Sequence, residues 1–191
     1  MTLLIVGLAL FLGCHLLPVF SRGRATIRAR LGEGAFKGLF SLVSAVGLVL
    51  IVIGFAAARE AGSPVVWTPP AAMRHITMLI MLPVFIFLIA AYVPGHIKAA
   101  LKHPMLVAVK LWALAHLLTN GDLAGIVLFG SFLAWAVIDR ISVKRRAPAA
   151  GAGALAPAAW RNDALAIAGG LAVYAAFVMG LHLMLIGVPI L

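Results

Sequence analysis

The residues of this 191-residue chain best suited to chemistry are its histidines. The six histidines are His15, His75, His96, His103, His116 and His182. Three of them, His15, His116 and His182, lie within long apolar segments, whereas the others fall near predicted helix ends. An imidazole among apolar residues costs free energy unless it forms a hydrogen bond or binds a metal ion. These three histidines are therefore candidates for metal ligation, with a hydrogen bond between helices as the alternative for each.

Two of these histidines have neighbours that bear on a cofactor. Trp112, His116 and Asn120 are spaced by four and would form one stripe on a helix, with an aromatic ring and an amide beside the imidazole. This arrangement suits a cofactor pocket, and an interfacial tryptophan beside an Asn-Gly turn is the alternative. His15 precedes Pro18, which could kink or end its helix and expose the imidazole to a neighbouring helix.

Other kinds of site are disfavoured. The five acidic residues all lie in or beside predicted loops, so the apolar segments offer no carboxylate pair for a di-iron centre or for proton-coupled transport. The single cysteine, Cys14, has no partner for a disulfide or a cysteine zinc site. The chain contains no phosphate loop, serine-nucleophile motif or paired-histidine zinc motif, so the catalytic residues are unknown at this stage.

The elements that must position the histidines are membrane helices. Apolar residues make up 64% of the chain and charged residues 10%, well outside the composition of soluble domains. The net charge is +10, and the charged residues lie between long apolar runs. This pattern indicates membrane topology rather than nucleic-acid binding. We predict a single all-α domain over residues 1–191, a polytopic bundle in contact with lipid. Its six expected spans are residues 2–20, 35–58, 76–93, 105–118, 123–138 and 164–188.

Basic residues predict the orientation of these spans. The first, third and fifth loop regions carry five, two and five lysines or arginines, whereas the second carries two and the fourth none. Because basic residues collect on the cytoplasmic side, both termini are predicted to be periplasmic in a multi-pass protein of the bacterial inner membrane. We interpret residues 139–163 as a flexible cytoplasmic loop.

Small residues recur along the second predicted span. Gly38, Ser41, Ser44 and Gly47 follow one another at steps of three, and Gly54 comes seven residues later. A narrow strip without large side chains lets two helices approach closely. We predict that this strip packs against another helix.

Three segments resemble a known family. They are Gly7 to Pro18, which contains Gly-Cys-His-Leu-Leu-Pro; Arg30 to Leu42; and His103-Pro104 through Trp112 to Asp122. Together they resemble the NnrU family of bacterial membrane proteins, named for its association with nitrite and nitric oxide reduction genes. That family is similar to the 15-cis-zeta-carotene isomerase of plants, a membrane enzyme that holds haem b between two histidines.

The resemblance implies a cofactor and its ligands. It implies haem b with His15 and His116 as the axial metal ligands and His103 in a supporting role, while Trp112 and Asn120 join the cofactor-binding set through their spacing. The implied activity is a redox-gated isomerisation of a cis double bond, or a related oxidoreduction, with a hydrophobic polyene as substrate. A cysteine near the second ligand of the plant enzyme falls at Ala113 here, so the chain lacks that thiol.

Two alternatives stay open. In the predicted topology His15 lies about 8 Å, and His116 about 18 Å, from the cytoplasmic ends of their helices, so His15 with His103 is the alternative ligand pair. The alternative function is a non-enzymatic accessory or assembly protein for denitrification or respiratory complexes. A small-solute channel is a third reading, for which the sequence shows no broken helices or polar pore lining.

Overall fold

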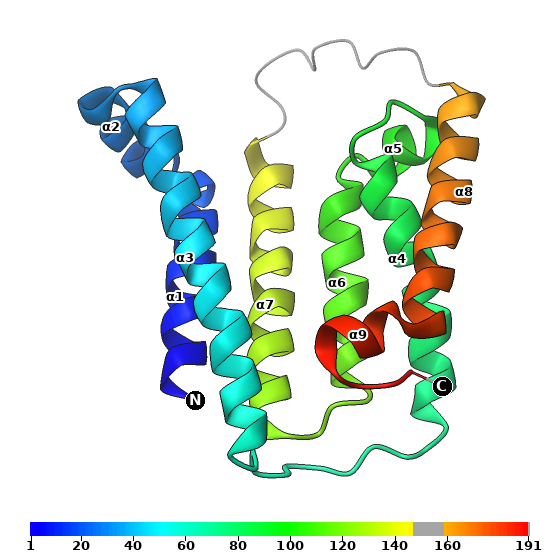
Figure 1. Ribbon diagram of the computed structural model, residues 1–191. Coiled ribbons are helices and arrows are strands. Elements are labelled where there is room, and N and C mark those ends of the chain that lie inside the picture. Colours follow the sequence, from blue (N-terminus) through cyan, green and yellow to red (C-terminus); the bar gives the residue numbers. More distant parts are fainter. Residues whose placement is uncertain (147–158, 191) are drawn as a thin grey trace. The chain divides into compact units, whose positions relative to one another are not determined.

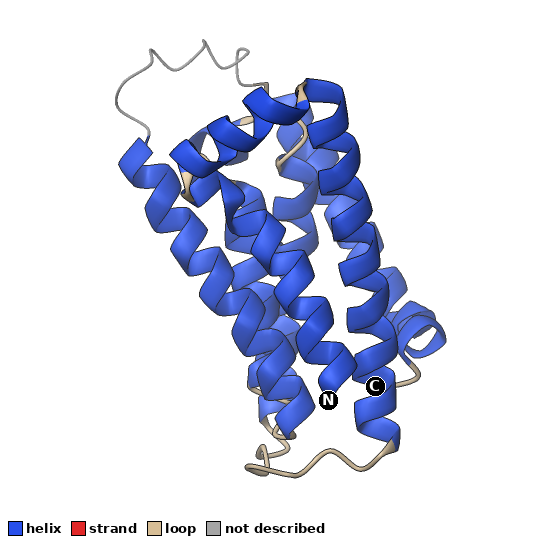
Figure 2. Ribbon diagram, turned by 90° about the vertical axis from the view of Figure 1, so that its left-hand side faces the viewer, coloured by secondary structure: helices blue, strands red, loops and turns tan. Residues whose placement is uncertain are grey.

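Helices form nearly all of the regular structure. The structure is a computed structural model that describes residues 1–146 and 159–190 (Figure 1). Within these residues, Figure 2 shows helices joined by short loops, and the β-structure is one isolated bridge between Val65 and Asp122. The chain divides into two compact units. Unit 1 comprises Met1–Pro69 and Asn120–Lys144, and unit 2 comprises Pro70–Thr119 and the described part of Arg145–Leu191.

Unit 1 is built on a close pair of helices. Its elements are α1 (Thr2–Leu16), the 3₁₀ turn η1 (Leu17–Val19), α2 (Ser21–Leu31), α3 (Glu33–Glu60) and α7 (Leu123–Arg146). Helices α1 and α3 lie side by side, and glycines stand at their contact (Figure 1). A Cβ atom on Gly47 would lie 2.8 Å from the backbone nitrogen of Phe11, and one on Gly54 would overlap the backbone of Leu4. The predicted packing strip is therefore confirmed at Gly47 and Gly54, whereas Gly38 faces open space.

Helix α7 completes unit 1 through aromatic contacts. The ring of Phe132 lies 5.8 Å from that of Phe11 on α1, and the ring of Phe129 lies 6.3 Å from that of Phe55 on α3. Asp122 directly precedes the helix, and its carboxylate accepts a hydrogen bond from the Gly125 backbone N–H at 3.0 Å. This side-chain cap satisfies one of the backbone donors that a helix N-terminus leaves open.

A loop contact fixes the start of α7 within unit 1. The backbone N–H of Leu123 donates to the Pro64 carbonyl at 2.8 Å, and that of Ala124 donates to Ser63 Oγ at 2.9 Å. Gly121 has no room for a Cβ atom because the Trp67 carbonyl oxygen occupies that position. The segment from Gly121 to Ala124 thus docks against the loop that follows α3.

Unit 2 is arranged around α4. Its elements are α4 (Met73–Ala90), α5 (His96–Leu101), α6 (Pro104–Leu117), α8 (Trp160–Ala176), the π-helical segment η2 (Phe177–Leu181) and α9 (His182–Ile186). Helix α4 contacts both α6 and α8. Thr77 on α4 donates a hydrogen bond to the Ala115 carbonyl at 2.9 Å, and the Tyr174 hydroxyl on α8 donates to the Met78 carbonyl at 3.1 Å.

Within residues 1–146 and 159–190, five helical segments are long and apolar enough to cross a membrane. They are Thr2–Val19, Glu33–Glu60, Met73–Ala90, Leu123–Arg145 and Trp160–Ile186. Helix α6 matches the fourth predicted span, but its 14 residues extend only about 21 Å, less than the roughly 30 Å of the hydrocarbon layer. The fold is therefore an all-helical, multi-pass membrane protein with five candidate spans.

Several boundaries differ from the sequence prediction. The arginine-rich segment after the first span is a helix, α2, and the short helix α5 was not anticipated. Helix α7 continues to Arg146 and α8 begins at Trp160, so both ends of the expected loop 139–163 are helical, and its centre lies outside the described residues. The last expected span, 164–188, is interrupted at Gly180, where φ is 157°.

Candidate functional site

His15 is the next-to-last residue of α1 and is surrounded by aromatic rings of unit 1. Its ring centroid lies 4.3 Å from that of Phe11, 5.2 Å from that of Phe40 and 5.9 Å from that of Trp135. Its Nδ1 lies 2.7 Å from the Phe11 carbonyl oxygen, one helical turn earlier. A carbonyl oxygen can only accept, so Nδ1 carries a proton, and Nε2 is the nitrogen that can offer a lone pair to a metal ion.

Cys14 lies beside His15 but is oriented toward α3. Its Sγ is 3.2 Å from Ser44 Oγ and 3.5 Å from the Phe11 carbonyl oxygen, to which the thiol can donate. The distance from Sγ to Nδ1 of His15 is 3.9 Å. The thiol therefore contacts the protonated nitrogen of the imidazole, not the nitrogen that carries the lone pair.

His116 occupies the corresponding position near the end of α6 in unit 2. Its Nδ1 lies 2.8 Å from the Trp112 carbonyl oxygen, again one turn earlier, which assigns the proton to Nδ1 and the lone pair to Nε2. The rings of Trp112 and His116 have centroids 5.3 Å apart, as their spacing by four predicts. His15 and His116 thus share one local geometry, each at the end of an apolar helix.

Neither of the remaining residues predicted around His116 belongs to helix α6. Helix α6 ends at Leu117, so Asn120 belongs to the following turn and to unit 1, and the expected stripe of three is wrong at this residue. The turn residues that follow Leu117 end the helix before a further residue can join the stripe. His103 precedes the first residue of α6, about 20 Å along the helix axis from His116. His103 and His116 therefore cannot coordinate one metal ion together.

His182 stands where the final helix is broken. The π-helical turn η2 ends at Leu181, and His182 opens α9, with its Nδ1 2.7 Å from the Val188 carbonyl oxygen. This bond again assigns the proton to Nδ1. The acceptor of His182 lies six residues later in the chain, whereas those of His15 and His116 lie four residues earlier, so this contact joins the first residue of α9 to the segment that follows the helix.

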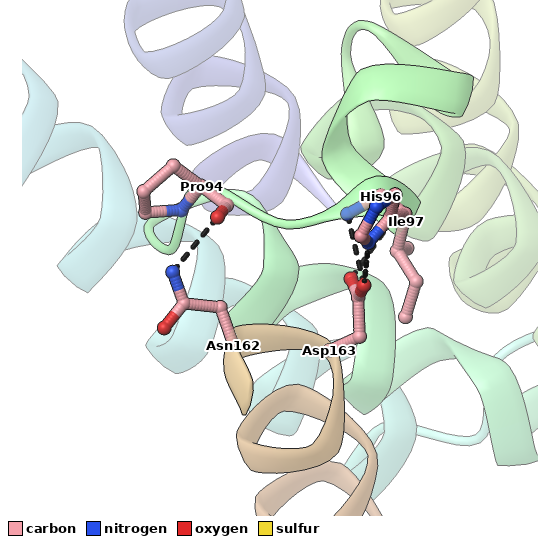
Figure 3. Close-up of polar contacts among 5 residues, drawn as sticks. All are labelled: Pro94, His96, Ile97, Asn162 and Asp163. Atoms are coloured by element: carbon pink, nitrogen blue, oxygen red, sulfur yellow. Dashed lines mark hydrogen bonds and ion pairs between the residues drawn. The ribbon is translucent and has the colours of Figure 1, made fainter. Parts of the chain in front are cut away.

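A polar cluster that the sequence did not reveal joins α5 to α8 (Figure 3). The Asp163 carboxylate, which is 5% exposed, accepts hydrogen bonds from the backbone N–H groups of His96 at 2.9 Å and Ile97 at 3.0 Å. It also lies 2.7 Å from Nδ1 of His96. Asn162 adds a bond from its amide to the Pro94 carbonyl at 2.8 Å.

The cluster fastens the first turn of α8 to the start of α5. The His96 ring stacks on Trp160 at 4.0 Å, and a Cβ atom on Gly95 would overlap the Asp163 carboxylate. The residues it joins are 67 positions apart in the sequence, so no local pattern could have paired them. Because every bond to the carboxylate ties two elements together, its role here is structural.

Metal-ligating side chains do not gather into one group in the described parts of the chain. Across residues 1–146 and 159–190, no three His, Cys, Asp or Glu side chains lie close enough to hold a metal ion. The arrangement instead offers individual histidines, each with a defined tautomer, at the ends of apolar helices.

The comparisons with known proteins place the chain in a family. The model of the NnrU protein family matches residues 3–190. The chain belongs to the NnrU family. This match covers both units of the fold and agrees with the segments that carry the resemblance in the sequence. No curated protein and no solved structure matches this NnrU-family chain.

Proposed function

We propose that this NnrU-family protein binds haem b in the membrane, with His15 and His116 as axial ligands. The observation that carries the proposal is the shared geometry of the two imidazoles. Each donates its Nδ1–H to the backbone carbonyl one turn earlier, at 2.7 and 2.8 Å. Metal-bound histidines almost always donate their second ring N–H to a carbonyl or carboxylate, which fixes the tautomer and orients the ring.

The donor set suits haem rather than a free metal ion. A porphyrin supplies four nitrogen ligands itself, so the protein needs to contribute only one or two side chains. Single histidines at helix ends meet that requirement. The phenylalanine rings against His15 provide the apolar walls that exclude water from a haem edge.

The proposed reaction is a redox-gated isomerisation of a cis double bond in a hydrophobic polyene. Haem supplies an iron centre whose oxidation state alters its axial ligation. The chain's own residues orient the two ligand imidazoles, hold each proton on Nδ1 and keep the site in a low-dielectric, apolar environment. A substrate dissolved in the membrane would reach such a site through lipid, without an aqueous channel.

His103 is the alternative second ligand. In the predicted topology, the end of α1 that carries His15 and the start of α6 that carries His103 both face the cytoplasm. The resemblance to the plant isomerase places the second axial ligand at His116 and thus favours His116 over His103.

We further propose that α6 is a sixth crossing and that both termini are periplasmic, in the bacterial inner membrane. With six crossings, the basic residues of the first, third and fifth loop regions share one side. Single cysteines at residues 62, 98 and 119 in a Cys14→Ser background test this arrangement. Labelling of positions 62 and 119 from the periplasm with a membrane-impermeant maleimide, and protection of position 98, would support it. Protection of position 119 would refute the crossing by α6, and labelling of position 98 with protection of position 62 would refute the orientation.

Haem binding is tested by the absorption spectrum of protein purified from cells supplied with a haem precursor. The proposal predicts a low-spin Soret band whose position shifts on reduction with dithionite. If no Soret band forms, even after haem is added to the purified protein, haem binding is refuted. The accessory-protein alternative then becomes the better explanation, with the histidines serving as hydrogen-bonding groups between helix turns.

A further inference from the structure

The indole of Trp135 on α7 presents a buried donor beside His15. The Trp135 ring meets the His15 ring edge-on, at 89° and 5.9 Å between centroids. Its Nε1 is shielded from solvent and has no hydrogen-bond acceptor among the residues that the structure describes. Both residues belong to unit 1, so their proximity does not depend on where unit 2 lies.

An unpaired indole N–H is unusual at such a position. The indole nitrogen can only donate, and a buried tryptophan normally finds an acceptor for it. Inside a membrane no bulk water is present to accept the bond. A phenylalanine, as at positions 129 and 132 on the same helix, would fill an apolar site without this cost. The donor therefore indicates an oxygen acceptor that arrives with a bound group.

We propose that Trp135 Nε1–H donates a hydrogen bond to a propionate oxygen of the haem held by His15. This inference rests on the proposed function, because it requires haem at His15. The propionates are the hydrogen-bond acceptors that a porphyrin carries at its edge, and a bond from an N–H to a carboxylate is among the stronger ones in proteins. Asp139 lies one turn further on α7 and adds negative charge near this position.

The test compares haem with its dimethyl ester, in which both propionates are esterified and uncharged. We expect Trp135→Phe to raise the Kd for haem about tenfold, equivalent to about 1.4 kcal/mol. The same substitution should change the Kd for the ester less than twofold, because the strong acceptor is already lost. Any effect of the smaller phenylalanine ring on packing would appear equally with both ligands, so the difference isolates the N–H to carboxylate bond.

Trp67→Phe is the matched control. Trp67 also belongs to unit 1 but lies in the loop after α3, and its side chain is partly exposed. This variant should bind haem and its ester as the wild type does.

The outcomes separate this inference from the proposed function. A wild type that binds no haem overturns both. A wild type that binds haem, with Trp135→Phe binding it equally well, overturns this inference alone. An equal loss of affinity for haem and for the ester also overturns it, because the Trp135 N–H would then bond to water or serve packing rather than a propionate.

Discussion

Replacing Gly54 with leucine should separate α1 from α3. A Cβ atom at Gly54 would lie 2.7 Å from the Leu3 carbonyl carbon and 2.8 Å from the Leu4 Cα, about 1 Å closer than ordinary contact. These are backbone atoms, which cannot rotate away as a side chain can. Relief therefore requires the two helices to move apart by about 1 Å, and α1 carries His15 near its end.

The cost follows from the leucines buried on α1. Leu4, Leu8 and Leu12 are at most 8% exposed. A buried leucine gains about 7 kcal/mol from all its dispersion contacts; if a third of these face α3, a gap of about 1 Å forfeits about 0.6–1.2 kcal/mol per leucine. Three leucines lose about 2–4 kcal/mol, and the better helix propensity of leucine returns about 0.8 kcal/mol. We expect a net destabilisation of about 1–3 kcal/mol.

Gly38→Leu provides the matched control on the same helix. A Cβ atom at Gly38 meets nothing within 4 Å, so this variant should be neutral or slightly stabilised. The free energy of unfolding can be measured by titration with SDS from mild detergent micelles. Cys14, the only cysteine, lies against Ser44 at the same helix contact, so its reaction with a membrane-permeant maleimide should accelerate only in Gly54→Leu. Equal stability and equal Cys14 reactivity in the two variants would refute the packing argument.

Two further predictions concern hydrogen bonds. Asp163→Asn should lower the SDS midpoint of unfolding much more than Asp122→Asn. The amide at position 163 cannot accept all the bonds from α5, whereas asparagine at position 122 caps a helix as well as aspartate does. Equal shifts of the midpoint would count against a structural role for the cluster at His96. Tyr174→Phe should lower the free energy of unfolding by about 0.6–1 kcal/mol in the same titration, because the bond to the Met78 carbonyl is lost. An unchanged free energy of unfolding would show that this bond contributes no net stability.

The apolar pattern predicted the helices but not all of their ends. The second predicted span, residues 35–58, corresponds to α3 at Glu33–Glu60, because an uninterrupted apolar run determines a membrane helix. The Arg-rich segment after the first span reads as a loop because arginine indicates a position outside the lipid. Arginine is also a good helix former, and the segment forms α2. Helix α7 continues to Arg146 because basic side chains stabilise the C-terminal end of a helix.

The candidate site was predictable where it is local. His15 and His116 were singled out because each lies in an apolar run, and the pairing of Trp112 with His116 follows from helical spacing. The contact between His15 and Trp135 joins residues 120 positions apart, and the bond from His96 to Asp163 joins residues 67 apart. Such contacts depend on which helices pack together, which a single sequence does not specify.

If His15 and His116 are the ligands of haem, spectra of single alanine variants will identify them. The oxidised and dithionite-reduced spectra of the wild type should be compared with those of His15→Ala, His116→Ala, His103→Ala and His182→Ala. We expect the low-spin spectrum to be lost in the His15 and His116 variants and retained in the other two. A low-spin spectrum that survives in His15→Ala or in His116→Ala would contradict the assignment of that residue as an axial ligand.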